Sequence, residues 1–352
     1  MKVLVLGGTG AMGIHLVQLL SKGNNEIFVT TRSKRTSDGK IHYIQGNAHE
    51  IEFLKTCLKN PWDIIVDFMA YSTLEFAQRV NLLLDVTSHY IFLSSARVYA
   101  DSDTPIIETS PRLLDVSQDH EFLATDEYSL AKARQEDILI NSKYDNWTII
   151  RPYITYSETR LQLGVLEKET WLYRALHHRT IVFSKDIAEK TTTLTYGFDV
   201  AQGIATIIGV ESVKKQIYHI TSDESHTWME IFNWYLIVFE KQLGYKPKVM
   251  IIDDNPRVDI NSSKYQVVYD RCYNRNFDNT KIKKLIDTTI FKDTKEGITN
   301  CLVTFIRNPQ FKINSWSEHA MYDRITGEWT SLSEMKTWKH RIKYLLRRTI
   351  IY

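Results

Sequence analysis

The feature that most constrains this chain is a short apolar run joined to a glycine-rich turn at its start. Residues 1–6 read Met-Lys-Val-Leu-Val-Leu, and residues 7–13 read Gly-Gly-Thr-Gly-Ala-Met-Gly. Residues 14–20 then carry apolar side chains at helical spacing, and the pattern stops at Gly23. A strand, a tight glycine turn and a helix in this order can bind the pyrophosphate of a dinucleotide, because the turn is bare and the helix N-terminus offers free N–H groups. The alternative interpretation is a tight turn without a ligand.

Apolar runs of strand length alternate with helical patterns through the first half of the chain. Strands are expected at residues 3–6, 27–31, 42–45, 64–69, 90–94 and 148–151. Helices are expected at residues 13–22, 49–59, 73–86 and 126–142. Continuous apolar strands with helices between them are typical of a parallel sheet covered on both faces. We therefore predict an α/β protein with a Rossmann-type doubly wound parallel sheet.

The pattern changes after Pro152, which indicates a second, smaller α/β domain for a substrate. The predicted dinucleotide-binding domain covers residues 1–155, with returning segments near 181–225, and the substrate domain comprises 156–180 and 226–335. Further expected elements are strands at 181–183 and 192–196, a helix over about 200–210 capped by Asp199, a helix from Thr227 to about Leu243, a long loop at 253–280 and a helix from near Asn279.

The length, net charge and cysteine spacing of the chain limit the partners and the cellular location that we expect. The chain has 352 residues and a formal net charge of +2, and so small a net charge does not indicate a nucleic-acid partner. The three cysteines, Cys57, Cys272 and Cys301, lack metal-type spacing, and no metal is expected. The first strand begins at the N-terminus, so we expect no secretory signal and predict a cytoplasmic protein.

The end of the second expected strand bears on the choice of dinucleotide. An NAD site normally has a carboxylate at this point, which holds the adenosine ribose hydroxyls. This chain has Thr31 there, followed by Arg32, Lys34 and Arg35. Arg32 could pair with a ribose 2′-phosphate in a bidentate manner, so we favour NADP(H), with NAD as the alternative. The alternative interpretation is that these basic residues belong to a solvated loop that binds no ligand.

A tyrosine, a lysine and a serine form the candidate chemistry. Tyr128 and Lys132 lie four residues apart on one expected helix face, and Ser95 follows the strand that ends near residue 94. A tyrosine with the usual pKa near 10 is a poor proton acceptor, and an ammonium beside it favours the phenolate. Such a tyrosine can move a proton on or off an alcohol oxygen while a hydride moves at the nicotinamide.

The chain resembles the extended short-chain dehydrogenase/reductases of the nucleotide-sugar epimerase/dehydratase type. The resemblance covers most of the chain to about residue 300 and rests on residues 7–13, 94–99, 105–108, 128–132 with Glu136, 151–152, 198–201 and 278–281. It implies catalytic roles for Ser95, Tyr128 and Lys132. It also implies cofactor contacts by Gly7, Thr9, Gly10, Ala11, Met12, Gly13, Thr31, Arg32, Lys34, Arg35, Asn47, Met69, Ala70, Tyr71, Tyr128, Lys132 and Pro152.

Departures from the family pattern narrow the expected reaction. Family dehydratases carry an Asp-Glu pair after the catalytic hydroxyl residue, where this chain has Ala96 and Arg97, so dehydration is disfavoured. Epimerases of the UDP-galactose type have an asparagine after the corresponding arginine. In this chain, Arg151 is followed instead by Pro152 and Tyr153. Asn47 replaces a usual adenine-binding aspartate. These differences leave the substrate open.

The substrate expected from the resemblance is a nucleotide-activated sugar. Candidate substrate contacts are Ser94, Arg97, Tyr153, Arg160, Arg174 and Arg179, because guanidinium forks suit a diphosphate. For each of Arg160, Arg174 and Arg179, a surface position without a ligand is an equally good interpretation. The expected activity is an NAD(P)-dependent reductase or epimerase in bacterial surface-polysaccharide synthesis, acting as a homodimer through helices 73–86 and 126–142. The alternative is a non-catalytic NADP-binding sensor, scaffold or RNA-binding protein of the same fold.

The C-terminal stretch 336–352 is basic and amphipathic. It contains six lysines and arginines and no acid, with Trp338, Ile342, Leu345, Leu346 and Ile350 interspersed. Such a helix can lie on an anionic membrane. The other interpretation, which we favour, is a helix that docks on its own protein, since one face must be apolar in either case.

Overall fold

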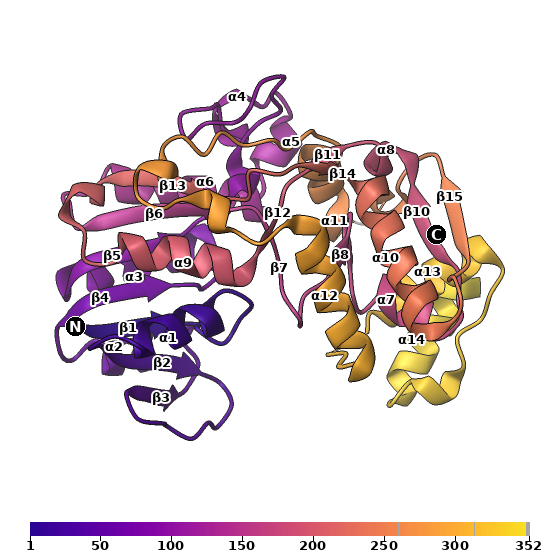
Figure 1. The fold of residues 1–352 in the computed structure, drawn as a ribbon, viewed down its shortest axis with the longest axis horizontal. Helices are drawn as coiled ribbons and strands as arrows, with labels where there is room; N and C mark the ends of the chain where they lie inside the picture. The colour runs from indigo at the N-terminus through magenta and orange to yellow at the C-terminus, as the bar shows by residue number, and fades with distance from the viewer. Residues whose placement is uncertain (260, 313, 350–352) are drawn as a thin grey trace. The chain divides into compact units, whose positions relative to one another are not determined.

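The computed structural model describes residues 1–259, 261–312 and 314–349 (Figure 1). The chain forms two compact units. The first unit comprises Met1–Ser157, Thr193–Ser225 and Arg275–Thr294. The second unit comprises Glu158–Thr192, His226–Asn274 and Lys295–Tyr352. Residues 260, 313 and 350–352, which include part of the predicted basic helix, lie outside the described residues.

A seven-stranded, fully parallel sheet forms the centre of the first unit, with strand order β13-β6-β5-β4-β1-β2-β3. The strands are β1 (Lys2–Leu6), β2 (Glu26–Thr31), β3 (Ile41–Gln45), β4 (Trp62–Asp67), β5 (Thr87–Leu93), β6 (Trp147–Pro152) and β13 (Gln216–Ile220). The chain reverses its direction of progression across the sheet between β3 and β4, next to β1. The predicted doubly wound parallel sheet is therefore confirmed.

Helices cover both faces of this sheet, because alternate strand residues point to opposite sides. On one face, Val3 and Val5 of β1 share a core with α1 (Gly13–Ser21) and α9 (Gly197–Ile207). On the other face, Leu4 and Leu6 pack in a core with α2 (Ile51–Cys57), α3 (Thr73–Asp85) and α6 (Tyr128–Ile140). Figure 1 shows α9 beside β6 and β5, and α1 beside β1 and β2.

The first unit also contains several short elements after β5. They are the short helices α4 (Leu113–Val116) and α5 (His120–Leu123) and a parallel pair of strands, β7 (Ile154–Tyr156) and β12 (Leu194–Tyr196). Segment 275–294 returns to this unit, and Ile106 forms an isolated parallel bridge with Phe277. This segment was expected to begin a helix near Asn279, but it contains two short 3-10 turns instead, Ile282–Lys284 and Thr288–Ile290.

The second unit is mostly helical. Its helices are α7 (Trp171–Leu176), α8 (Lys185–Ala188), α10 (Trp228–Leu243), α11 (Asn261–Gln266), α12 (Thr294–Arg307), α13 (Trp316–Thr326) and α14 (Trp338–Thr349). Its strands form three pairs, β8 (Gln162–Leu163) with β9 (Leu166–Glu167), β10 (Ile181–Ser184) with β15 (Val249–Ile252), and β11 (Thr191–Thr192) with β14 (His226–Thr227).

Local signals located α10 well, whereas the unit boundaries differ from those expected. Thr227 and Glu230 form the predicted capping box, and Gly244 ends α10 with a left-handed φ of 74°.

Residues 181–192, expected in the dinucleotide domain, belong to the second unit, where β10 pairs with β15. Residues 253–280, expected as a loop, contain α11 and a π-helical turn at Val267–Arg271.

Candidate active site

The glycine turn combines two positions that need glycine with one that is open. Gly7 adopts a left-handed φ of +70°, and a Cβ on Gly13 would lie 2.7 Å from the backbone of Gly8, so both positions need glycine. A Cβ on Gly10 would meet no atom within 4 Å. Thr9 and Gly10 are exposed at the N-terminus of α1, while Ala11 and Met12 are partly buried. The open side of Gly10 and the adjoining helix N-terminus form a cradle that fits a pyrophosphate.

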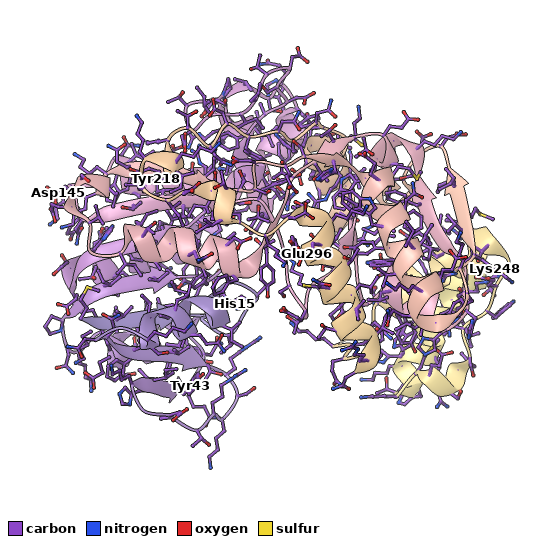
Figure 2. All side chains as sticks on the ribbon, in the orientation of Figure 1. His15, Tyr43, Asp145, Tyr218, Lys248 and Glu296 are labelled. Carbon is purple, nitrogen blue, oxygen red and sulfur yellow. The ribbon has the colours of Figure 1, made fainter. Side chains whose placement is uncertain are left out.

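At the end of β2, the predicted cationic positions are accessible. The Thr31 side chain is buried and donates a hydrogen bond to the Ser33 carbonyl oxygen at 3.1 Å. Arg32 and Lys34 are exposed, and they form no ion pair with any described residue. Arg35 lies 5.7 Å above the ring of Tyr43, which Figure 2 labels at the β3 side of the sheet. Two cations are thus available to an anion at this strand end.

Asn47, which follows β3, is held by its own loop. Its side-chain oxygen accepts a hydrogen bond from the His49 N–H at 3.2 Å, and its amide donates to Glu50 at 3.3 Å. The nearby Tyr71 is buried, with the Arg79 guanidinium 4.4 Å from its ring centroid. Met69 is next to the glycine turn, since its sulfur would lie 2.9 Å from a Cβ on Gly7. Ala70, between them, is exposed.

Lys132 connects the ends of two central strands. Its buried Nζ donates hydrogen bonds to the carbonyl oxygens of Leu93, the last residue of β5, at 2.7 Å and of Met69, just after β4, at 3.2 Å. It also lies 4.5 Å over the ring of Phe92. Burial lowers the pKa of Lys132 to about 8, although the carboxylates of Asp67 and Glu136 act in the opposite direction. The ammonium form therefore still predominates at neutral pH.

Tyr128 begins α6, one helical turn before Lys132, and is 40% exposed. The Arg97 guanidinium lies 5.2 Å from the centroid of the Tyr128 ring and pairs with Glu127 at 2.6 Å. Glu127 in turn accepts hydrogen bonds from the backbone N–H and the hydroxyl of Ser129 at 2.7 and 2.5 Å. The Arg97 guanidinium thus lies over this ring, and Lys132 follows Tyr128 by one turn on the same helix.

Ser95 follows β5 at the same edge of the sheet. Its hydroxyl oxygen accepts a hydrogen bond from the Arg97 N–H at 3.2 Å and caps a short 3-10 turn, Ala96–Val98. Ligands bind at the carboxyl ends of parallel strands. Because Met69 contacts the position above Gly7 and Lys132 contacts both Met69 and Leu93, the glycine turn, Lys132 and Ser95 form one continuous region at this edge.

Ser94, predicted to contact substrate, is instead part of a buried ionic network. Its hydroxyl donates to Glu136 at 2.6 Å, and the same carboxylate accepts from Arg151 at 2.8 and 2.7 Å and from Arg112 at 3.3 Å. The side chains of Glu136 and Arg151 are 0% and 2% exposed, so the network is structural. The predicted contact residues Pro152 and Tyr153 are also packed within the first unit. Pro152 is the last residue of β6, and the centroid of the Tyr153 ring lies 5.3 Å from that of the Phe277 ring.

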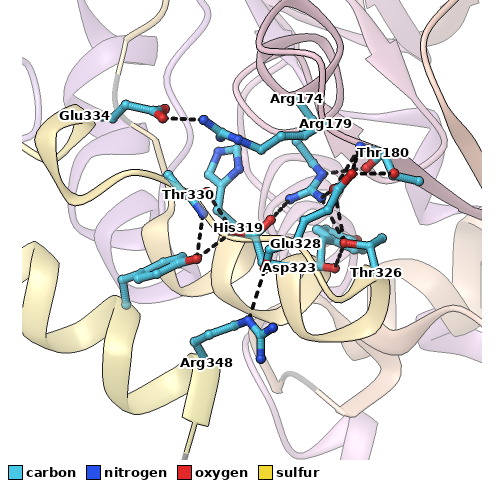
Figure 3. Close-up of polar contacts among 12 residues, drawn as sticks. Arg174, Arg179, Thr180, His319, Asp323, Thr326, Glu328, Thr330, Glu334 and Arg348 are labelled. Atoms are coloured by element: carbon cyan, nitrogen blue, oxygen red, sulfur yellow. Dashed lines mark hydrogen bonds and ion pairs between the residues drawn. The ribbon is translucent and has the colours of Figure 1, made fainter.

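The three arginines predicted for a diphosphate all lie in the second unit and have acidic partners. Arg174 is buried and pairs with Asp323 at 2.6 Å and Glu328 at 2.9 Å (Figure 3). Arg179 pairs with Glu334. Arg160 lies 3.6 Å from Glu167 and is 41% exposed. The contacts of Arg174 and Arg179 are those of structural residues, and of the three only Arg160 keeps substantial exposure.

The structure contains no metal-type cluster of three or more His, Cys, Asp or Glu side chains within the described ranges. Within those same ranges, no helix combines the length and the apolar character needed to cross a membrane.

The fold and the match to a family model together define the class of protein. The chain belongs to the NAD dependent epimerase/dehydratase family, whose model matches residues 3–221. This confirms the resemblance inferred from the motifs.

Two curated proteins and two solved structures illustrate the similarity. A chloroplast stem-loop binding protein of 41 kDa from Arabidopsis thaliana is 25% identical over 244 residues, covering 64% of this chain and 60% of that protein. A UDP-glucose 4-epimerase from Streptococcus mutans is 31% identical over 137 residues, covering 32% of this chain and 41% of that protein. The chain thus matches less than two thirds of the length of either relative.

The structural matches extend over most of the chain. An epimerase from Methanothermobacter thermautotrophicus superposes with a TM-score of 0.68 at 17% identity, covering 87% of this chain and 92% of that one. A UDP-glucuronic acid 4-epimerase from Bacillus cereus, in complex with UDP-glucuronic acid and NAD, superposes with a TM-score of 0.66 at 14% identity, covering 87% and 99%. At these identities the likeness establishes the fold.

Proposed function

We propose that this chain is a nicotinamide-dinucleotide-dependent epimerase or reductase that acts on a nucleotide-activated sugar. The observation that carries the proposal is the position of Lys132, which joins the ends of β4 and β5 one helical turn from the exposed Tyr128. Family membership and the sugar-nucleotide substrates named for similar proteins support it. The proposed pathway, bacterial surface-polysaccharide synthesis, depends on the family resemblance alone.

The residues of the first unit fit a dinucleotide. The bare Gly10 and the N-terminus of α1 would hold the pyrophosphate, and the strand-end loops after β2 and β4 would flank it. When bound, the nicotinamide would accept or return a hydride. The exposed Arg32 and Lys34, in place of a carboxylate, favour NADP(H) over NAD. The family description and the Bacillus neighbour name NAD, so NAD remains the alternative.

Tyr128 would carry the proton in this mechanism. Its phenolate accepts the proton of a sugar hydroxyl as that carbon loses a hydride, and the phenol returns the proton when the hydride comes back. Lys132, one helical turn along α6, and Arg97, over the Tyr128 ring, would supply positive charge on this side of the site. The Ser95 hydroxyl would hold the reacting oxygen. Since Arg97 occupies the position of a dehydratase acid, elimination of water is not part of the proposal.

A Tyr128→Phe variant tests the proposal directly. It should retain dinucleotide binding, because the lost hydroxyl is not part of the glycine turn, and should lose about 10²- to 10⁴-fold in turnover. Turnover is measured with UDP-glucose and UDP-glucuronic acid. Sugar interconversion without net cofactor consumption indicates an epimerase, and stoichiometric NADPH oxidation indicates a reductase. Unchanged turnover in the variant would refute the assigned role of Tyr128.

A non-catalytic role is the second candidate, because one similar protein is named as a stem-loop binding protein. In that case, Tyr128→Phe would leave stem-loop binding intact, and neither sugar nucleotide would be converted. A homodimer through α3 and α6 remains a prediction, to be checked by light scattering of the purified chain.

A further inference from the structure

Helix α14 docks on the second unit through only one of its faces. Tyr344 is fully buried, and its hydroxyl donates to Asp323 at 2.7 Å and accepts from the Thr330 N–H at 2.8 Å. Arg348 donates from Nε to the Glu328 carbonyl oxygen at 3.3 Å (Figure 3). Its guanidinium also lies 4.6 Å over the ring of Trp329. The Tyr344 ring also belongs to an apolar cluster with Tyr173, Trp316, Ala320 and Met335, so this face attaches the helix to its own protein.

The apolar stripe of α14 is on the other side of the helix. At about 100° per residue, its four large apolar side chains fall within an arc of about 100°, centred roughly 145° from Tyr344. They are Trp338, Ile342, Leu345 and Leu346, which are 65%, 47%, 36% and 40% exposed. The helix therefore docks on its own protein, as favoured from the sequence, but through the face with Tyr344 and not through this stripe. A contiguous exposed apolar patch marks an interaction site.

Cations line this stripe. Residues 335–349 contain Lys336, Lys339, Arg341, Lys343, Arg347 and Arg348 and no acidic residue. Lys339 and Lys343 are exposed and follow the stripe on one flank, and the exposed Arg341 lies on the other. An apolar strip between rows of cations, with a tryptophan at one end, suits the interface of a bilayer with anionic headgroups.

We propose that α14 is a peripheral anchor that binds this protein to an anionic membrane surface. A second copy of the chain fits less well, since a two-fold contact would bring the two sets of six cations together. Nucleic acid would use the cations but would leave the apolar side chains in water. On an anionic bilayer the stripe enters the headgroup boundary while the flanking cations meet lipid phosphates. This proposal is independent of the sugar-nucleotide activity.

Sedimentation of the full chain with lipid vesicles tests the anchor. Binding is expected to vesicles of phosphatidylcholine mixed with phosphatidylglycerol, to be weak on phosphatidylcholine alone, and to be released by high salt. Ile342→Ser with Leu346→Ser should weaken binding at least about tenfold, and Lys339→Ser and Lys343→Ser should each weaken it about fivefold. Circular dichroism melts confirm folding, which these exposed positions should not affect.

The matched control is Ile237→Ser on α10, which removes a 57% exposed isoleucine from the same unit. It should bind vesicles as the unaltered chain does. Equal binding to neutral and anionic vesicles, no binding to either, or equal loss in the control overturns the anchor. So does a concentration-dependent dimer, or an RNA complex, that is abolished by the α14 substitutions while vesicle binding is absent.

Discussion

Lys132 shows how burial and function act on one side chain. The chain buries its ammonium against two carbonyl oxygens, Met69 and Leu93, and this costs stability because an ion loses its water. The same placement keeps a positive charge at the strand ends where the proposed chemistry occurs. A residue chosen for stability alone would be apolar here, so the lysine itself indicates a functional site.

Removing this charge should change the pH dependence of stability. The pKa of Lys132 falls from 10.5 when unfolded to about 8 when folded, so the unfolded chain binds more protons between these values. The unfolding free energy of the unaltered chain should therefore rise by about 3 kcal/mol over this range relative to Lys132→Met. Urea titrations at several pH values measure it. A parallel pH dependence in both chains would contradict the burial of a charged Lys132.

In the proposed site, Arg32 is the residue expected to decide the cofactor preference. Arg32→Ala should weaken NADP binding about tenfold, the loss expected for a guanidinium pair with a phosphate, while NAD binding changes little. Calorimetric titration with both dinucleotides measures the ratio. Lys22→Ala, which removes an exposed cation at the end of α1, is the control and should leave both affinities unchanged. Equal losses for NADP and NAD in Arg32→Ala would remove the argument for NADP.

Among the elements, the returning segment 275–294 shows where local sequence reading stops. Asn279 is buried and donates to the Thr221 carbonyl oxygen and to Asp223, both at 2.8 Å, which ties the segment to the end of β13. The local pattern around residue 279 predicted a helix start. These hydrogen bonds, to residues more than fifty positions away, instead hold an irregular path with two short 3-10 turns, Ile282–Lys284 and Thr288–Ile290.

Asp199 takes part in the same attachment. The sequence predicts that it caps a helix, but it lies within the first turn of α9 and accepts the Lys292 N–H at 2.8 Å. Burial raises the pKa of Asp199 to about 6. Its folded form binds the proton more tightly than the unfolded form, so its contribution to stability falls as pH rises from 3.8 through 6.

Asp199→Asn should therefore stabilise the first unit at neutral pH, because an amide oxygen can keep the hydrogen bond without the buried charge. The expected gain is up to about 3 kcal/mol above pH 6 and should vanish near pH 4. Thermal melts at the two pH values measure it. A loss of stability at neutral pH would show that the charge itself attaches the segment.

At the scale of the whole molecule, each of the two units has apolar clusters of its own. The first unit is built on the parallel sheet, and the second has its own cluster of Tyr173, Trp316, Ala320, Met335 and Tyr344. The glycine turn, Lys132, Tyr128 and Ser95 all belong to the first unit. A dinucleotide that binds only to them should therefore protect that unit specifically.

Hydrogen exchange should detect this division. A dinucleotide at about a hundredfold its dissociation constant stabilises the unit that binds it by about 2.7 kcal/mol. Slowed exchange is expected at the strands of the first unit, with little change in α10 or α13. Exchange followed by mass spectrometry, with and without NADP, resolves these peptides. Protection confined to α10 and α13 would place the ligand elsewhere and contradict the proposed site.

The sequence by itself determined the features that are encoded within a few residues of one another. The glycine turn, the continuous apolar run of β1, the Tyr128–Lys132 spacing and the capping box at Thr227 each follow from local backbone geometry and periodicity. They sufficed for the doubly wound fold, the family and the candidate residues at the strand ends.

The tertiary structure decided which groups the polar side chains meet. Ser94 joins Glu136, and Arg174 joins Asp323 and Glu328, across separations that carry no periodic signal. The exposed stripe of α14 has the same origin, since an amphipathic helix does not reveal in its sequence which face will dock. Partner choice between distant segments depends on the packing of the complete fold, so only the folded chain determines it.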